Sequence, residues 1–177
     1  MSQIPSGSDL AVATYSQHQQ AEDAVKALKN AGFDMQKISV IGKDYRLEEH
    51  VVGYLNAGER TKIFVRLGAF WDGLLGILFG SAILSIPVVG QVIILGPLAA
   101  LIFAGLEGAV LVGVGGANAL IGAMSSIGIP KNSVIGYENA IKAGEILLVV
   151  HGNAEDVLRA KSLLQMSELQ SFDHHNT

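Results

Sequence analysis

The chain has 177 residues, of which 50% are hydrophobic and 16% are charged, whereas an ordinary soluble domain carries about 25% charged residues. This length suits one domain, or one domain with a large insertion, and excludes two large catalytic domains. A formal net charge of -4 gives no attraction to phosphate backbones, so no nucleic-acid partner is expected, and the absence of cysteine excludes disulfides, Cys-based zinc sites and thiol catalysis.

The N-terminal part predicts a flexible arm followed by a β-α-β unit. Residues 1–8 have no basic segment ahead of an apolar run, so we expect an arm and not a signal peptide, with the polar parts in the cytosol. Within residues 9–43, the apolar run 10–15 predicts a strand, the 3.6-residue period over 17–31 predicts a helix that ends at Gly32, and residues 37–42 predict a second strand.

The C-terminal residues 145–177 repeat this pattern. Residues 146–151 predict a strand, Asn153 is the expected N-cap of a helix, and residues 169–174 predict a short last strand. Sliding one end of the chain along the other by 136 residues superposes the two patterns, because Tyr15 falls on His151 and Leu28 on Leu164. Two β-α-β halves predict an α+β, ferredoxin-like fold with everything between them as an insertion.

The insertion begins with a polar connector over residues 44–67, in which residues 47–55 suit a short helix and 61–67 suit a strand or the start of the next region. Residues 68–116 are then almost entirely apolar, with Asp72 and Glu107 as their only charges. About 20 apolar residues cross a bilayer, so this region predicts a helical hairpin with both termini cytoplasmic and Trp71 at the interface. A helical return segment follows over 117–144, with a helix from Pro130 to Ala143.

Glycine is concentrated in this apolar region, with thirteen of the 21 glycines lying between Gly68 and Gly128. Small residues at a spacing of four let helix backbones approach closely in lipid or in a tight helix cluster. The pattern predicts a glycine zipper for helix packing or oligomerisation, formed by Gly76, Gly80, Ala100, Ala104, Gly105, Gly108, Ala109, Gly113 and Ala117.

Three functions fit this organisation. The hairpin anchors the protein in the cytoplasmic membrane, or it is buried between the subunits of a soluble homo-oligomer such as a filament or shell. In the third interpretation the protein is a small-ligand or ion sensor that uses Glu107, whose buried carboxylate requires a partner or a raised pKa. The expected partners are therefore the chain itself and a lipid bilayer, and the sequence identifies no small-molecule ligand.

The sequence contains no recognisable catalytic or cofactor-binding constellation, so we expect a protein that is not an enzyme and has no cofactor. Residues 113–119 only partly match a dinucleotide-binding turn, since Asn118 stands where Gly or Ala is needed. His174 and His175 next to Asp173 suit a solvated tail better than a metal site. Tyr137 and Glu138 suit an ordinary amphipathic helix.

Several short motifs occur together in one order: residues 21–32, 38–42, 87–90, 96–98, 115–120, 128–130 and 137–150. This order resembles bacterial general-stress-type proteins with a glycine-zipper central region, a family described as membrane-associated and of unknown function. The resemblance covers about residues 9–167 and implies a bacterial stress-linked protein with no recognised enzymatic activity. Residues 44–58 and the tail after Met166 have no counterpart in it.

Overall fold

The computed structural model describes residues 9–44, 53–78, 80–86, 88–104, 120–122, 124–125 and 127–176. The strands are β1 (Asp9–Tyr15), β2 (Ile38–Lys43), β3 (Gly53–Tyr54), β4 (Ser81–Ile86), β5 (Gly90–Leu95), β6 (Ile146–Gly152) and β7 (Ser171–His175). The helices are α1 (His18–Asn30), α2 (Ala57–Leu67), α3 (Ala69–Leu75), α4 (Pro97–Ala104), α6 (Lys131–Lys142) and α7 (Ala154–Leu164), with a short 3-10 turn at Met35–Lys37.

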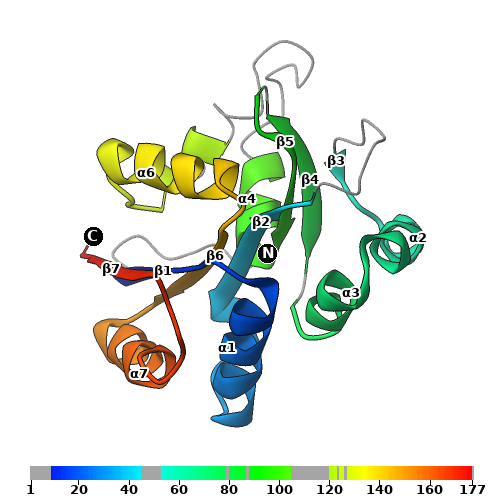
Figure 1. Ribbon diagram of the computed structural model, residues 1–177. Helices are drawn as coiled ribbons and strands as arrows, with labels where there is room; N and C mark the ends of the chain where they lie inside the picture. Colours follow the sequence, from blue (N-terminus) through cyan, green and yellow to red (C-terminus); the bar gives the residue numbers. More distant parts are fainter. Residues whose placement is uncertain are drawn as a thin grey trace.

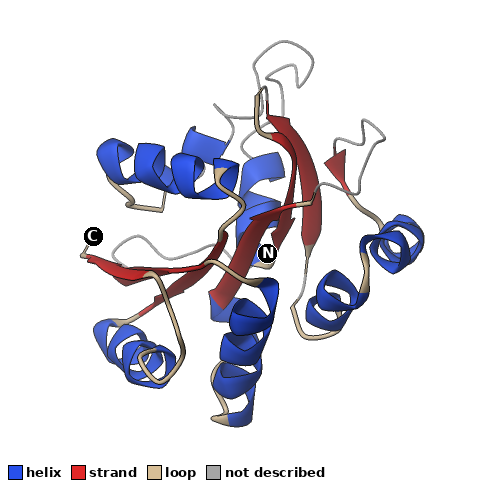
Figure 2. Ribbon diagram, viewed as in Figure 1, coloured by secondary structure: helices blue, strands red, loops and turns tan. Residues whose placement is uncertain are grey.

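The strands form one seven-stranded sheet in the order β3-β4-β5-β2-β6-β1-β7, and each neighbouring pair is antiparallel. Strands from the two ends of the chain interleave, so that β6 lies between β1 and β2 (Figure 2). Helices and an antiparallel sheet in one molecule confirm the predicted α+β class. The strands and helices expected at the two ends of the chain are present as β1-α1-β2 and β6-α7-β7.

Helices cover both faces of the sheet (Figure 1). Side chains alternate along β1, so that Ala11, Ala13 and Tyr15 join the core beneath α1, α3 and α7. Leu10 and Val12 join a second core beneath α4 and α6. The helix expected between Pro130 and Ala143 is α6, and it belongs to the layer over this second core.

The predicted apolar helical hairpin is wrong over residues 68–95. Instead of one long helix, the chain forms α3, β4 and β5, and the two strands meet through a turn in which the Val89 amide donates to the Ile86 carbonyl at 3.1 Å. Both strands are buried on both faces, as Ile83 and Ile93 in one core and Leu84 and Ile94 in the other show. A strand that is covered on both faces is apolar at every position, so its sequence cannot be distinguished by periodicity from that of a buried helix.

The expected membrane-spanning helices and the expected interfacial position of Trp71 also differ from the structure. No helix among the residues that the structure describes is long and apolar enough to span a bilayer. Trp71, expected at a membrane interface, is only 1% exposed. It packs over β2, where a Cβ added at Gly42 would lie 2.8 Å from the indole ring.

The predicted zipper residues fall into three groups. Gly76 follows the last residue of α3 and Gly80 precedes β4, so these two glycines do not share a helix. Ala100 and Ala104 do lie on one helix, α4. Outside the described residues lie Gly105, Glu107, Gly108, Ala109, Gly113 and Ala117.

The polar connector contains β3 and α2. Residues 61–67 belong to α2, so the strand, which was one of the two alternatives for this segment, is wrong. The capping box at Asn56 explains the helix start: Asn56 accepts from the Glu59 amide at 3.0 Å and Glu59 accepts from the Asn56 amide at 3.3 Å. The short helix expected over 47–55 falls partly outside the described residues, and residues 53–54 form β3.

Candidate functional site

A polar cleft of about 490 Å³ lies between α6 and the edge strand β7. Three separate segments of the chain line it: the end of β1, the helix α6 with the residue before β6, and β7. The described lining residues are Thr14, Ser133, Gly136, Tyr137, Ala140, Glu145, Ser171, Phe172, Asp173, His174 and His175.

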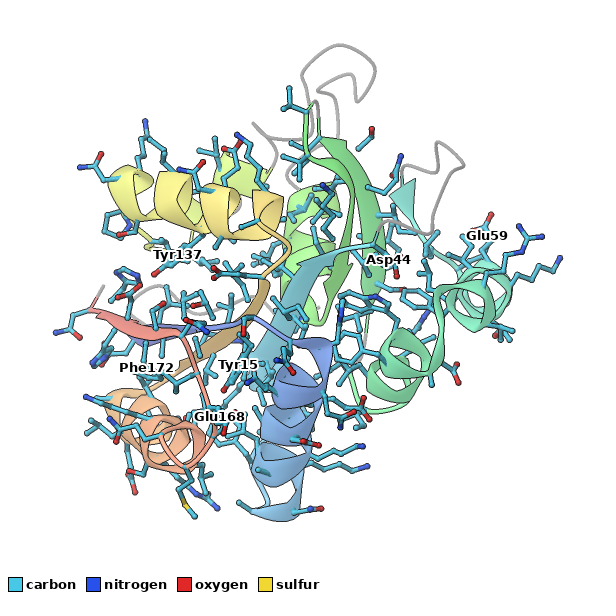
Figure 3. The ribbon with its side chains drawn as sticks, viewed as in Figure 1. Tyr15, Asp44, Glu59, Tyr137, Glu168 and Phe172 are labelled. Carbon is cyan, nitrogen blue, oxygen red and sulfur yellow. The ribbon has the colours of Figure 1, made fainter. Side chains whose placement is uncertain are left out.

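The alternation of side chains along β7 gives the cleft its polar wall. Asp173 and His175 pair with Val12 and Leu10, which belong to the core on the α6 side. Phe172 pairs with Ala13 and its ring packs against the opposite core, where the Lys161 ammonium lies 5.8 Å from the ring centre. Asp173 and His175 therefore face α6, while Phe172 faces α7 (Figure 3).

Helix α6 supplies the opposite wall. Tyr137 projects from it toward β7 and is 4% exposed (Figure 3). One position earlier, a Cβ added at Gly136 would meet no atom within 4 Å, so the absence of a side chain there leaves space at the cleft. The helix starts after Pro130, a residue type that is favoured at helix starts, and its apolar face is formed by Val134, Tyr137 and Ile141.

A hydrogen-bonded chain of three side chains joins the two walls. The Tyr137 hydroxyl donates to Oδ2 of Asp173 at 3.0 Å, and its oxygen lies 2.7 Å from Nε2 of His175. When the hydroxyl donates its one hydrogen to Asp173, Nε2 of His175 is the donor to the tyrosine oxygen and Nδ1 is left as an acceptor. A ligand entering the cleft thus meets a carboxylate and an imidazole whose orientations are fixed.

Burial sets the protonation states of Tyr137 and His175. It raises the pKa of Tyr137, and the hydrogen bond and the charge of Asp173 raise that pKa further. Burial also lowers the pKa of His175, an effect that Asp173 partly opposes and His174 reinforces. A neutral phenol and a neutral imidazole at neutral pH are suited to hydrogen bonding rather than to proton transfer.

Two hydroxyl side chains line the cleft next to the hydrogen-bonded Tyr137, Asp173 and His175. Thr14 Oγ1 and Ser171 Oγ lie 2.8 Å apart across the β1–β7 pair. Within the described part of the chain, no group of three or more potential metal ligands of the His, Cys, Asp and Glu types is found. The polar groups of the cleft are carboxylates, hydroxyls and imidazoles.

None of the sequence-predicted site residues that the structure describes lines this cleft. Gly76, Gly80 and Ala100 lie elsewhere, in or beside α3, β4 and α4. Tyr137, Asp173 and His175 were not identified as site residues from the sequence. Tyr137 was assigned to an ordinary amphipathic helix and the other two to a solvated tail. The strand expected at 169–174 was the available signal, since alternation along it would have placed Asp173 and His175 on one face.

The fold and the cleft define an α+β protein with a ligand-sized polar site at the edge of its sheet. Over residues 11–85 the chain matches the family model described as the heat-induced stress protein YflT domain. This region runs from β1 into β4, so it is similar to a stress-protein domain, while α6 and β7 lie beyond it. No curated protein and no solved structure gives a significant match to the chain.

Proposed function

We propose that the protein is a stress-associated, non-enzymatic binding protein that takes a small polar ligand in the cleft between α6 and β7. The stress association is supported by the similarity of residues 11–85 to the heat-induced stress protein domain. The proposed scaffold is ferredoxin-like. Its support is the strand order β2-β6-β1-β7, with α1 and α7 packed against the same core, which is the arrangement that two β-α-β halves adopt.

The observation that carries the binding function is the cleft itself. Its volume of about 490 Å³ falls in the range of about 300–1,000 Å³ that is typical of small-molecule sites. Convergence of Thr14, Tyr137 and Asp173 from segments far apart in the sequence gives it fixed polar groups. Such groups orient a small ligand and provide its specificity.

The test is a titration of the ¹⁵N-labelled protein with a panel of small cationic, anionic and neutral polar compounds, followed by amide chemical shifts. We expect at least one compound to shift amides of α6 and β7 in the wild type. Gly136→Leu, which places a side chain at the cleft, should abolish these shifts. Asn139→Leu makes the same kind of change at an exposed α6 position outside the lining and should retain them. A panel in which no compound shifts the cleft amides would overturn the proposal.

Self-association is the second candidate, and helix α4 favours it. Its eight residues are all apolar, yet Ala100 is exposed, and a helix that is apolar all round is normally buried. Sedimentation equilibrium should show an oligomer that Ala100→Glu dissociates, whereas Ala27→Glu, at an exposed position of α1, should leave it intact. A monomer in the wild type contradicts this candidate. Membrane anchoring now depends on residues 105–119, which lie outside the described residues.

A further inference from the structure

We propose that the ligand of the α6–β7 cleft is a small organic cation, an amine with one or two ammonium groups held by Asp173 and Glu145. This inference rests on the proposed function, because it names the chemical class of the ligand for the same cleft. It follows from the charge of the lining, the hydrogen-bond capacity of its side chains, and the spacing of its two carboxylates.

The lining carries two carboxylates, Asp173 and Glu145, and no Lys or Arg among its described residues. The Glu145 side chain forms no hydrogen bond or ion pair within the described part of the chain. At Asp173, Tyr137 donates to Oδ2, which leaves Oδ1 open to accept. A cation in the cleft would meet two carboxylates with unused acceptor capacity.

Neighbouring groups add acceptors, and His174, the second imidazole of the lining, pairs with Asp9, whose Oδ2 lies 3.3 Å from its Nε2. An ammonium group has three donors and no acceptor, so it needs several oxygens or a ring nitrogen around it. Thr14, Ser133 and Ser171 provide hydroxyl oxygens, and His175 provides Nδ1 when its Nε2 donates to Tyr137. Because burial lowers the pKa of His175, this imidazole is neutral at neutral pH and does not repel a cation.

The two carboxylates are separated along the cleft. Asp173 pairs with Val12, whereas Glu145 stands one residue before Ile146, the partner of Tyr15. Their backbones are thus offset by about four residue positions along β1, or roughly 14 Å at about 3.4 Å per residue, and they also lie on opposite sides of β1, because β6 and β7 flank that strand. Since both side chains line the cleft between these positions, a ligand with an ammonium group at each end fits the charge distribution.

Three probes with four-carbon chains separate charge from shape: putrescine, butane-1,4-diol and succinate. Amide shifts and isothermal titration at low ionic strength should show binding of putrescine, with the diol and succinate at least ten-fold weaker. Asp173→Asn and Glu145→Gln should each weaken putrescine binding about ten-fold. Glu138→Gln removes the same charge from α6 outside the lining and should change the affinity less than two-fold.

The outcomes distinguish this inference from the proposed function. If the diol or succinate binds as tightly as putrescine, and Gly136→Leu abolishes that binding, the cation class is wrong while the cleft remains a binding site. If putrescine binds equally to the wild type and to Gly136→Leu, it binds elsewhere on the acidic surface and the inference fails. It also fails if none of the three probes binds while a neutral or anionic compound shifts the cleft amides.

Discussion

Acidification should destabilise the protein through His151 before most carboxylates are protonated. This residue lies in β6 opposite Leu10 and is 7% exposed. Burial lowers its pKa to about 4, and the nearby charge of Lys37 contributes in the same direction, while Asp34 opposes it. In the unfolded chain a histidine has a pKa of about 6.5, so folding keeps this imidazole neutral where water would protonate it.

The sign and size of the effect follow from linkage. Because the folded pKa is the lower one, the unfolded state binds more protons between about pH 6.5 and pH 4. The stability that depends on neutral His151 is therefore fully present above pH 6.5 and is lost as the pH falls to about 4. A difference of about 2.5 units at 1.36 kcal/mol per unit amounts to about 3 kcal/mol.

Urea unfolding followed by circular dichroism, at half-unit steps from pH 7.5 to pH 4, measures this loss. The free energy of unfolding of His151→Gln should change much less over the same range. His175→Gln is the control, because His175 also has a lowered pKa but is only half-buried. The lowered pKa of Asp156 acts below about pH 4 and does not confuse the result. Equal pH dependence in the wild type and His151→Gln would refute the reasoning.

Substitutions at four positions test backbone geometry and helix capping, each by the free energy of unfolding in urea. Gly96→Ala should lower the free energy of unfolding by about 2 kcal/mol or more, because the φ of Gly96 is +97° and an added Cβ would lie 2.3 Å from a backbone oxygen of β2. Gly136→Ala should instead raise it by up to about 1 kcal/mol, because a Cβ at this position of α6 meets no atom within 4 Å. Val88→Gly should raise the free energy of unfolding by about 1 kcal/mol, because a β-branched residue at φ 71° is strained. A lower free energy of unfolding in this variant would contradict the reasoning. Asn153→Ala should cost about 1 kcal/mol by removing the side-chain cap of α7, whereas Asn153→Asp should not.

The two ends of the chain could be predicted because their signals are local. Apolar residues of α1 recur at Ala21, Ala24, Val25 and Leu28, all of which are buried on one face. The N-cap expected at Asn153 is present, with its side chain accepting from the Asp156 amide at 2.7 Å. Caps and a 3.6-residue period depend on neighbours within a few positions, so they can be read without knowing the fold.

The centre of the chain could not be predicted in the same way. Residues such as Ile83 and Leu84 are adjacent in sequence and face opposite cores, so both are apolar. A run of this kind has neither the two-residue period of a half-exposed strand nor the period of a helix. The glycines were misleading for a related reason: Gly80 and Gly96 bring strand ends together, with the Gly96 amide donating to the Gly80 carbonyl at 3.1 Å.

The candidate site depends on contacts that the sequence does not contain locally. Tyr137 is separated from Asp173 by 36 residues and from His175 by 38. Knowing that residues 171–175 form a strand does not show which element lies over them. That requires the register of β7 on β1 and the position of α6 over the sheet, both of which depend on tertiary packing.

The insertion explains why a cleft exists at this edge of the sheet. Strands β1 and β6 are apolar on both faces, as Val12 and Val149 show on the side of α6, so that face requires a second layer of helices. Helix α6 provides part of this layer and packs closely where the sheet is apolar. At β7 the facing side chains change to Ser171, Asp173 and His175, which need polar partners and cannot form a dry interface. The cleft therefore arises where an apolar core between helix and sheet gives way to a polar edge strand, and its hydrogen-bonding groups are a consequence of that change.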